Sequence, residues 1–137
     1  MHEIEMLVRG LLRRCPNCGE LHIFRRWLTM VDRCPRCGLH FEREEGHWTG
    51  AIAINLVATE LVFVALLLIV IIRTWPDIPS TQLLIAGALL NLTFPLIFYP
   101  FAKTLWVAID LIAHPLEPKE RLEMASLQHV RERESLQ

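Results

Sequence analysis

The sequence predicts a membrane protein that consists of a short N-terminal helix, a four-cysteine ribbon, a hairpin of two transmembrane helices and a polar C-terminal helix. Three observations predict this class. All four cysteines lie in two near-copies of one short phrase, two long runs of the chain are almost free of charge, and Lys and Arg are nearly absent between these runs. A hydrophobic content of 53% is high for a soluble domain. The expected parts are residues 1–14, 15–47, 48–113 and 114–137.

An apolar stripe characterises the expected N-terminal helix. The stripe consists of Ile4, Leu7, Val8, Leu11 and Leu12. These positions recur at helical spacing, with Arg9 between them and Arg13 and Arg14 directly after them. Such a helix can lie on a membrane surface with its arginines at lipid phosphates, or it can pack the stripe against the ribbon. The sequence favours neither arrangement over the other.

The ribbon is predicted from two repeated phrases. They are Cys15-Pro16-Asn17-Cys18-Gly19 and Cys34-Pro35-Arg36-Cys37-Gly38. Fifteen residues separate the two phrases from Cys18 to Cys34, which is the spacing of a rubredoxin-like zinc ribbon with four thiolate ligands. In each phrase proline fixes φ, and glycine tolerates the left-handed turn in which backbone N–H groups approach the sulfurs. The chain has no other cysteine, so Cys15, Cys18, Cys34 and Cys37 form a complete ligand set for one ion.

We expect this ion to be one structural Zn²⁺. Residues 15–38 are too few to bury an adequate core, so the ion would supply folding energy. Four thiolates close the site and leave no position for water, which argues for structure or recognition rather than catalysis. Iron in the same geometry would give a redox centre, and disulfides would suit an oxidising compartment. The spacing and the expected cytoplasmic placement favour zinc over both.

The hairpin is predicted from the two runs that are almost free of charge. The expected spans are about residues 49–72 and 82–102, and the second helix is expected to continue toward residue 113. Each run reaches the roughly 20 apolar residues that a transmembrane helix needs, and Glu60 is the only charged residue in either span. Pro76 and Pro79 in the connection prevent one continuous helix, so the two spans are antiparallel.

The distribution of positive charge predicts the orientation of the hairpin. Eight arginines precede the first span and five Lys or Arg residues follow the second, whereas the connection holds Arg73 alone. By the positive-inside rule both termini face the cytoplasm, where the thiols stay reduced. We therefore expect a multi-pass protein of the cytoplasmic membrane that contacts the lipid bilayer.

A few polar residues interrupt the spans. Asn55 and Thr59 share a face of the first helix, Glu60 adjoins them, and Asn91 precedes Pro95 in the second. Polar side chains at such depth commonly join helices by hydrogen bonds, and an ionisable one is also a functional candidate. Pro95 has no N–H, so the Asn91 carbonyl lacks its helical donor, and we expect a protonated Glu60 to donate to it.

A second polar set lies at the cytoplasmic ends of the spans. It consists of Trp48, Lys103, Trp106 and Asp110. We expect these residues to form one cluster in which Lys103 meets Glu44 or Glu45, and we consider them candidates for contact with a partner.

The tail is expected to form a helix that begins near Pro118, with Glu120 early and Arg131 and Arg133 late, as the helix dipole favours. Its apolar residues are sparse, which predicts a solvated or weakly docked helix.

No catalytic motif is present. The six histidines lack the spacing of a catalytic zinc helix, and the chain has neither a phosphate-binding glycine loop nor a nucleophile elbow. Arg25-Arg26-Trp27 would suit a nucleic-acid binder, but these cations flank a membrane helix, where lipid contact and topology explain them more simply. We expect no enzyme activity and no nucleic-acid partner.

Taken together, these features resemble the bacterial membrane family catalogued as domain of unknown function 983. The matching residues are 15–19, Leu21 to Phe24, 34–38, Phe41-Glu42, Gly46, Gly50-Ala51 and Tyr99 to Asp110. The resemblance covers about residues 14–115. Two knuckles with two spans and Pro100-x-x-Lys103-x-x-Trp106 are more specific than the knuckles alone. Many members have a Gly-Asp type sequence where this chain has Gly46-His47-Trp48.

The resemblance implies a protein of the bacterial cytoplasmic membrane without an assigned activity. Members are often encoded near genes for haem–copper oxidase subunits and their assembly factors, which is an association rather than a mechanism. Our leading hypothesis is a non-enzymatic adaptor that helps assemble or stabilise such a respiratory-type complex. The alternative is a rubredoxin-like electron-transfer or metal-delivery module that uses the same thiolates, and a weaker one is a membrane-tethered nucleic-acid binder.

Overall fold

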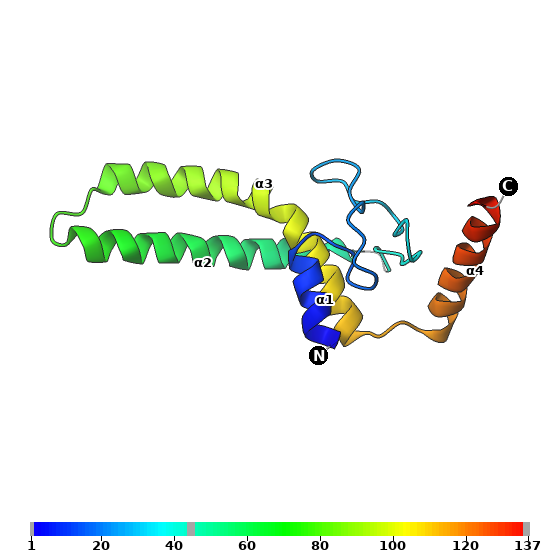
Figure 1. Ribbon diagram of the computed structural model, residues 1–137. Helices are drawn as coiled ribbons and strands as arrows, with labels where there is room; N and C mark the ends of the chain where they lie inside the picture. Colours follow the sequence, from blue (N-terminus) through cyan, green and yellow to red (C-terminus); the bar gives the residue numbers. More distant parts are fainter. Residues whose placement is uncertain (1, 44–45, 136–137) are drawn as a thin grey trace.

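The computed structural model describes residues 2–43 and 46–135, and this part of the chain contains four helices (Figure 1). They are α1 (His2–Leu11), α2 (Trp48–Thr74), α3 (Ser80–Ala113) and α4 (Pro118–Ser135). Between α1 and α2 lies the cysteine module, which we define as residues 15–43. Its described residues form two isolated antiparallel bridges, Phe24–Met30 and Arg33–His40, and no longer strand.

Helices α2 and α3 form a long antiparallel hairpin, and each is long and apolar enough to cross a membrane (Figure 1). Only a narrow stripe of each helix is buried against the other, so most of their apolar side chains lie at the surface. Gly87 permits close packing, because a Cβ at this position would lie 2.9 Å from the ring of Phe63. A large exposed apolar surface of this kind is typical of helices that contact lipid.

Asn55 makes the polar contact between the two helices. Its Nδ2 donates to the Pro95 carbonyl at 3.1 Å, and the Thr59 hydroxyl donates to the Asn55 carbonyl at 2.7 Å. The expected hydrogen bond from Glu60 to the Asn91 carbonyl is wrong. Thr59 is only 3% exposed on the buried face, and the next residue is rotated by about 100°, so Glu60 lies on the exposed face of α2. Within residues 2–43 and 46–135 Glu60 makes no hydrogen bond to α3.

Helix α3 changes direction along its length, and its C-terminal part runs beside α1 (Figure 1). Pro95 and Pro100 lie inside this helix, and each removes one backbone N–H from the helical ladder. The carbonyl of Leu96 would normally pair with the N–H of residue 100. Trp27 of the cysteine module supplies the missing donor, because its Nε1–H donates to the Leu96 carbonyl at 3.2 Å.

Helix α1 packs on the C-terminal part of α3 through Gly10. A Cβ on Gly10 would lie 2.9 Å from the Thr104 carbonyl oxygen, and the Thr104 hydroxyl donates to the Gly10 carbonyl at 2.6 Å. Met6 is buried on the same side. Of the predicted apolar stripe, Ile4, Val8, Leu11 and Leu12 are exposed. The alternative in which this stripe packs against the ribbon is therefore wrong, because the opposite face of α1 makes the contacts.

The core of the cysteine module continues into the helices. The buried members of this core other than the cysteines are Met6, Ile23, Met30, Leu39, Phe41, Val107 and Leu111. Met124 of α4 packs against them, and a Cβ on Gly38 would lie 3.6 Å from Leu127. Helix α4 thus touches the module through a few side chains, and none of its described residues is buried, which agrees with the expected weakly docked helix. Of its apolar residues, Met124 and Leu127 face the second knuckle, whereas Leu122 and Val130 are exposed.

We predict that Asn55→Leu lowers the thermal stability of the hairpin in detergent, because the Pro95 carbonyl loses its side-chain donor. A side-chain hydrogen bond between membrane helices contributes about 1 kcal/mol. The matched control is Glu60→Gln, which lies five residues away on the same helix and should leave the melting temperature unchanged. Equal melting temperatures for Asn55→Leu and the unmodified protein would contradict this prediction.

Candidate metal centre

The four cysteine sulfurs form a compact cluster. The Sγ atoms of Cys15 and Cys37 lie 3.7 Å apart, those of Cys18 and Cys34 lie 3.5 Å apart, and all four lie within 4.8 Å of one another. A tetrahedral ion with bonds of about 2.3 Å to four sulfurs would hold them about 3.8 Å apart. The cluster therefore fits one tetrahedral metal ion, and all four cysteines are free of disulfide bonds.

Two equivalent turns present these sulfurs. In the first knuckle the N–H of Gly19 donates to the Cys15 carbonyl at 2.8 Å, and in the second the N–H of Gly38 donates to the Cys34 carbonyl at 3.0 Å. Gly19 has φ +78° and Gly38 has φ +76°. Only glycine adopts this left-handed conformation without strain, so the structure confirms the conformational role predicted for both glycines.

Burial and charge distinguish the four thiols. Cys15, Cys34 and Cys37 are buried, whereas Cys18 is partly exposed. Hydrogen bonds from the thiol of Cys15 and, to a smaller extent, from that of Cys34 lower the pKa of Cys37 to about 4. The pKa of Cys15 is raised by hydrogen bonds with Cys34 and Cys37 and by burial. An ion that binds all four sulfurs as thiolates would release the remaining protons.

A terminal helix supports each knuckle from outside. Arg9 of α1 donates from Nη1 to the Asn17 carbonyl at 3.1 Å and pairs with Glu5 on its own helix. On the other side, Leu127 of α4 packs near Gly38 of the second knuckle. Neither support was expected from the sequence. The role of Arg9 could have been inferred from its position, because it is a charged residue that interrupts an apolar stripe one helical turn after Glu5.

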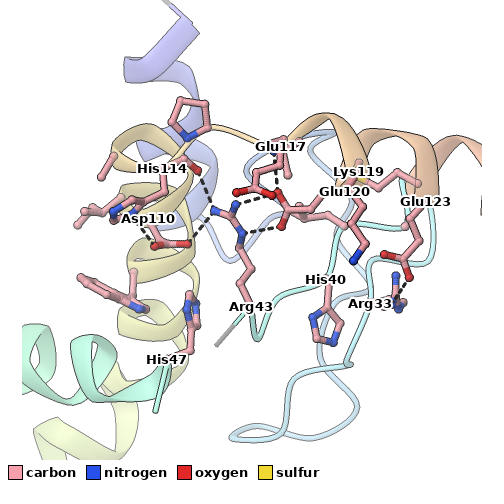
Figure 2. A pocket seen from close by; sticks show the side chains of 18 of the residues that line it. Arg33, His40, Arg43, His47, Asp110, His114, Glu117, Lys119, Glu120 and Glu123 are labelled. Carbon is pink, nitrogen blue, oxygen red and sulfur yellow. Dashed lines mark hydrogen bonds and ion pairs between the residues drawn. The ribbon is translucent and has the colours of Figure 1, made fainter. Parts of the chain in front are cut away.

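A cleft of about 900 Å³ lies between the second knuckle, the end of α3 and the start of α4 (Figure 2). Three of the six histidines, His40, His47 and His114, line it together with several carboxylates. Across residues 2–43 and 46–135, however, the four cysteines are the only group of three or more metal-ligating side chains that lie close enough to share an ion. The cleft is thus a polar junction, and the histidines do not form a second metal centre there.

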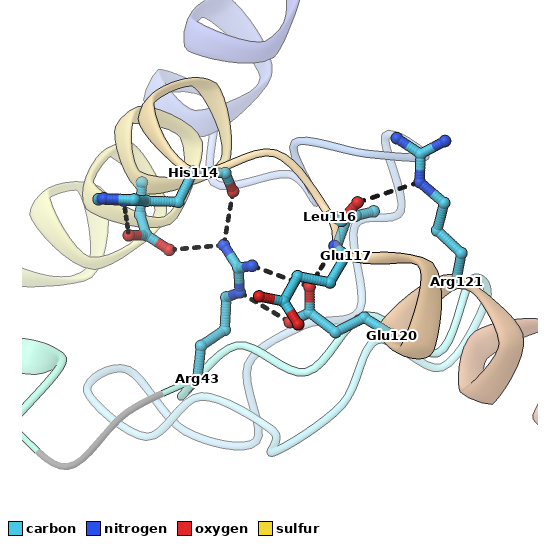
Figure 3. A network of polar contacts seen from close by, with 7 residues as sticks. Arg43, His114, Leu116, Glu117, Glu120 and Arg121 are labelled. Carbon is cyan, nitrogen blue, oxygen red and sulfur yellow. Dashed lines mark hydrogen bonds and ion pairs between the residues drawn. The ribbon is translucent and has the colours of Figure 1, made fainter.

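Arg43 is the central residue of this junction (Figure 3). Its Nε and Nη2 donate to the Glu120 carboxylate at 2.9 and 2.8 Å, and its Nη1 contacts Asp110 at 3.2 Å and the His114 carbonyl at 2.7 Å. The hydrogen bonds with Glu120 raise the pKa of Arg43, and those from Arg43 lower the pKa of Glu120. Arg43 therefore ties the module to α3 and α4. No pattern in the sequence distinguished it from the other arginines.

The polar set expected at the ends of the spans is divided among separate contacts. Lys103 Nζ lies 4.4 Å from the ring centre of Trp48 and donates to the Leu28 carbonyl at 3.2 Å. Its expected partners Glu44 and Glu45 lie outside the described residues.

Trp106 packs on the start of α2, since a Cβ on Gly50 would lie 2.2 Å from its indole, and Asp110 pairs with Arg43. Lys103 and Trp106 of α3 thus contact the start of α2, whereas Asp110 contacts the cysteine module, so these residues do not form one ionic cluster.

The family of the chain follows from a comparison with protein families. A family model described as protein of unknown function (DUF983) matches residues 24–110. The chain belongs to the DUF983 family. The matched stretch contains the second knuckle, the hairpin and Asp110, whereas Cys15 and Cys18 precede it. No curated protein and no solved structure matches this DUF983 chain.

We predict that the full-length protein binds one metal ion per chain and that Cys37→Ser weakens this binding. Because the energy of metal binding contributes to folding of the module, chelation should abolish its near-ultraviolet circular dichroism and spare the helical signal of the hairpin. His22→Ala, a change at an exposed residue of the same module, should keep full metal content. Folded protein without metal, or unaltered metal affinity in Cys37→Ser, would show that the cluster is not a metal site.

We predict that acid loosens α4 from the module. Since Arg43 lowers the folded-state pKa of Glu120, this pair stabilises docking fully above the unfolded pKa of about 4.3, and the contribution is lost as pH falls through the lower folded value. A ¹³C NMR titration of the glutamate carboxyls should show the depressed pKa of Glu120, and Arg43→Gln should return it toward the ordinary range. Arg131→Gln on the same helix is the control. Identical titrations in all three proteins would refute the pairing.

Proposed function

We propose that this DUF983 protein is a non-enzymatic adaptor of the bacterial cytoplasmic membrane that helps assemble or stabilise a respiratory-type complex of the haem–copper oxidase kind. Its hairpin anchors it, and a zinc-bearing module and both termini lie on the cytoplasmic side. The asymmetry of Lys and Arg supports this orientation. The choice of complex rests on the association with haem–copper oxidase genes that the family resemblance implies.

The chemistry of the metal centre supports a structural role for the ion. Four cysteine ligands complete a tetrahedral shell, so neither water nor a substrate finds a free position on the metal. Three of the four sulfurs are buried, and the core beneath them is shared with α1 and α3. Zinc agrees best with this role and with the spacing of the knuckles, because it has no redox chemistry and suits closed thiolate sites.

The observation that carries the proposal is the position of Glu60. This residue lies near the middle of α2, which runs from Trp48 to Thr74, and its side chain is exposed on the outer face of the hairpin. A carboxyl group in the apolar interior of a membrane is costly unless another polar group satisfies it. The described part of the chain offers Glu60 no such group, so a helix of a partner is the natural source. Interhelical hydrogen bonds of this type join membrane subunits.

Affinity purification from native membranes in mild detergent tests the proposal. We expect the unmodified protein to retain subunits of a respiratory-type complex, and Glu60→Leu to lose most of them while its metal content and thermal stability stay normal. The matched control is Thr93→Val, because Thr93 is also exposed in the hairpin but its hydroxyl bonds to the Leu89 carbonyl of its own helix. Recovery of the same subunits with Glu60→Leu at the unmodified yield would contradict the proposal.

The electron-transfer or metal-delivery alternative has one supporting observation, since Cys18 is the least buried of the four cysteines. The purified protein separates the two functions. A colourless, zinc-loaded and redox-silent protein agrees with the adaptor. Visible iron–thiolate absorption, or transfer of the ion to an acceptor through Cys18, would favour the alternative.

A further inference from the structure

A short loop projects from the cysteine module toward the hairpin. It spans residues 25–29 and closes on itself, because the N–H of Arg25 donates to the Thr29 carbonyl at 2.9 Å and the N–H of Thr29 donates to the Arg26 carbonyl at 3.3 Å. The bridge between Phe24 and Met30 closes its base, and Met30 is buried. We call residues 25–29 the basic loop.

Two hydrogen bonds fix the basic loop against α3. Trp27 Nε1 donates to the Leu96 carbonyl and Lys103 Nζ donates to the Leu28 carbonyl, both at 3.2 Å. Leu96 lies six residues before residue 102, where the predicted span ends, which corresponds to about 9 Å along a helix. With the hairpin in a membrane, the tip of the loop therefore lies at the depth of the lipid headgroups and the adjoining acyl chains.

The side chains of the basic loop suit that depth. Trp27 is 51% exposed and Leu28 is 41% exposed, so both present apolar surface outward. The guanidinium of Arg13 lies 4.5 Å from the Trp27 ring centre and holds the indole in place. Arg25 and Arg26 are exposed, and across residues 2–43 and 46–135 neither forms an ion pair with a carboxylate. An amphipathic tryptophan beside unpaired cations is the composition of an interfacial anchor.

Helix α1 adds a second exposed apolar face at the bend of α3. Its stripe residues Ile4, Val8, Leu11 and Leu12 lie at the surface, while Gly10 is packed on α3 beside Thr104. The apolar surface of the hairpin thus continues onto α1. A helix with an exposed apolar stripe and nearby arginines binds at the boundary between headgroups and acyl chains.

We propose that the basic loop, together with the stripe of α1, binds the anionic phospholipid headgroups of the bilayer that the hairpin crosses. Arg25 and Arg26 contact the lipid phosphates, and Trp27 and Leu28 enter the apolar boundary. A nucleic acid would neutralise the arginines but would leave the apolar side chains uncovered, and the tip is fixed against the span. The inference rests on the hairpin crossing a membrane and is independent of the identity of the protein partner.

Electron paramagnetic resonance of spin-labelled lipids tests this surface with the full-length, metal-loaded protein in phosphatidylcholine vesicles. The motionally restricted fraction should be larger for spin-labelled phosphatidylglycerol than for spin-labelled phosphatidylcholine. The double variant Arg25→Gln/Arg26→Gln should roughly halve this preference, because each cation near an anionic surface favours it. Arg25→Lys/Arg26→Lys should keep most of it. Arg131→Gln/Arg133→Gln, the same charge change on α4, should keep all of it.

Several results would overturn the proposal. It fails if the double glutamine variant keeps the full preference, or if inorganic phosphate displaces the anionic lipid better than chloride at equal ionic strength, which would indicate a site for free phosphate. It also fails if a single-stranded oligonucleotide binds at physiological salt and competes with the lipid. If neither lipid shows a restricted component, the hairpin itself does not enter the bilayer. In that case the membrane placement is wrong, whereas the other failures concern the basic loop alone.

Discussion

The hydrogen bond from the indole of Trp27 to the Leu96 carbonyl joins the cysteine module to the hairpin. The carbonyl lacks its helical donor because Pro100 has no N–H, and the donor comes from the cysteine module about 70 residues earlier in the chain. Pro95 and Pro100 lie inside α3, which changes direction along its length so that its C-terminal part lies beside α1. This hydrogen bond, together with the shared core and the contacts of Arg43, places the module at the end of the hairpin and its basic loop beside α3.

The metal centre therefore belongs to a larger body than the module alone. Buried side chains of α1 and α3, among them Met6 and Val107, share one core with the module, and α4 closes the other side through Arg43 and Glu120. The energy that an ion contributes to the folding of the knuckles then also stabilises the end of α3. The proposed adaptor function would benefit from this coupling, because partners on the module and on the hairpin would be held in a fixed orientation relative to each other.

Much of this arrangement could be predicted from the sequence, because its signals are local. The repeated knuckles predict the cluster of four cysteines and its glycine turns, and the apolar runs predict the long helices. The errors concern which face of a helix is buried. The expected hydrogen bond from Glu60 to α3 is wrong because Thr59 takes the buried position on α2. The stripe of α1 is exposed because Gly10 provides the face that packs on α3. Arg43 was missed because its importance comes from residues distant in sequence, which no local pattern reveals.

The claim that the metal, the module and the end of α3 form one body is tested most directly by hydrogen–deuterium exchange in nanodiscs, with the ion bound and after its removal by a chelator. Our account predicts that the backbone amides of residues 104–111 exchange faster once the ion is removed, while those in the middle of α2 keep their protection. Unchanged protection of residues 104–111, together with loss of protection in the two knuckles, would contradict it.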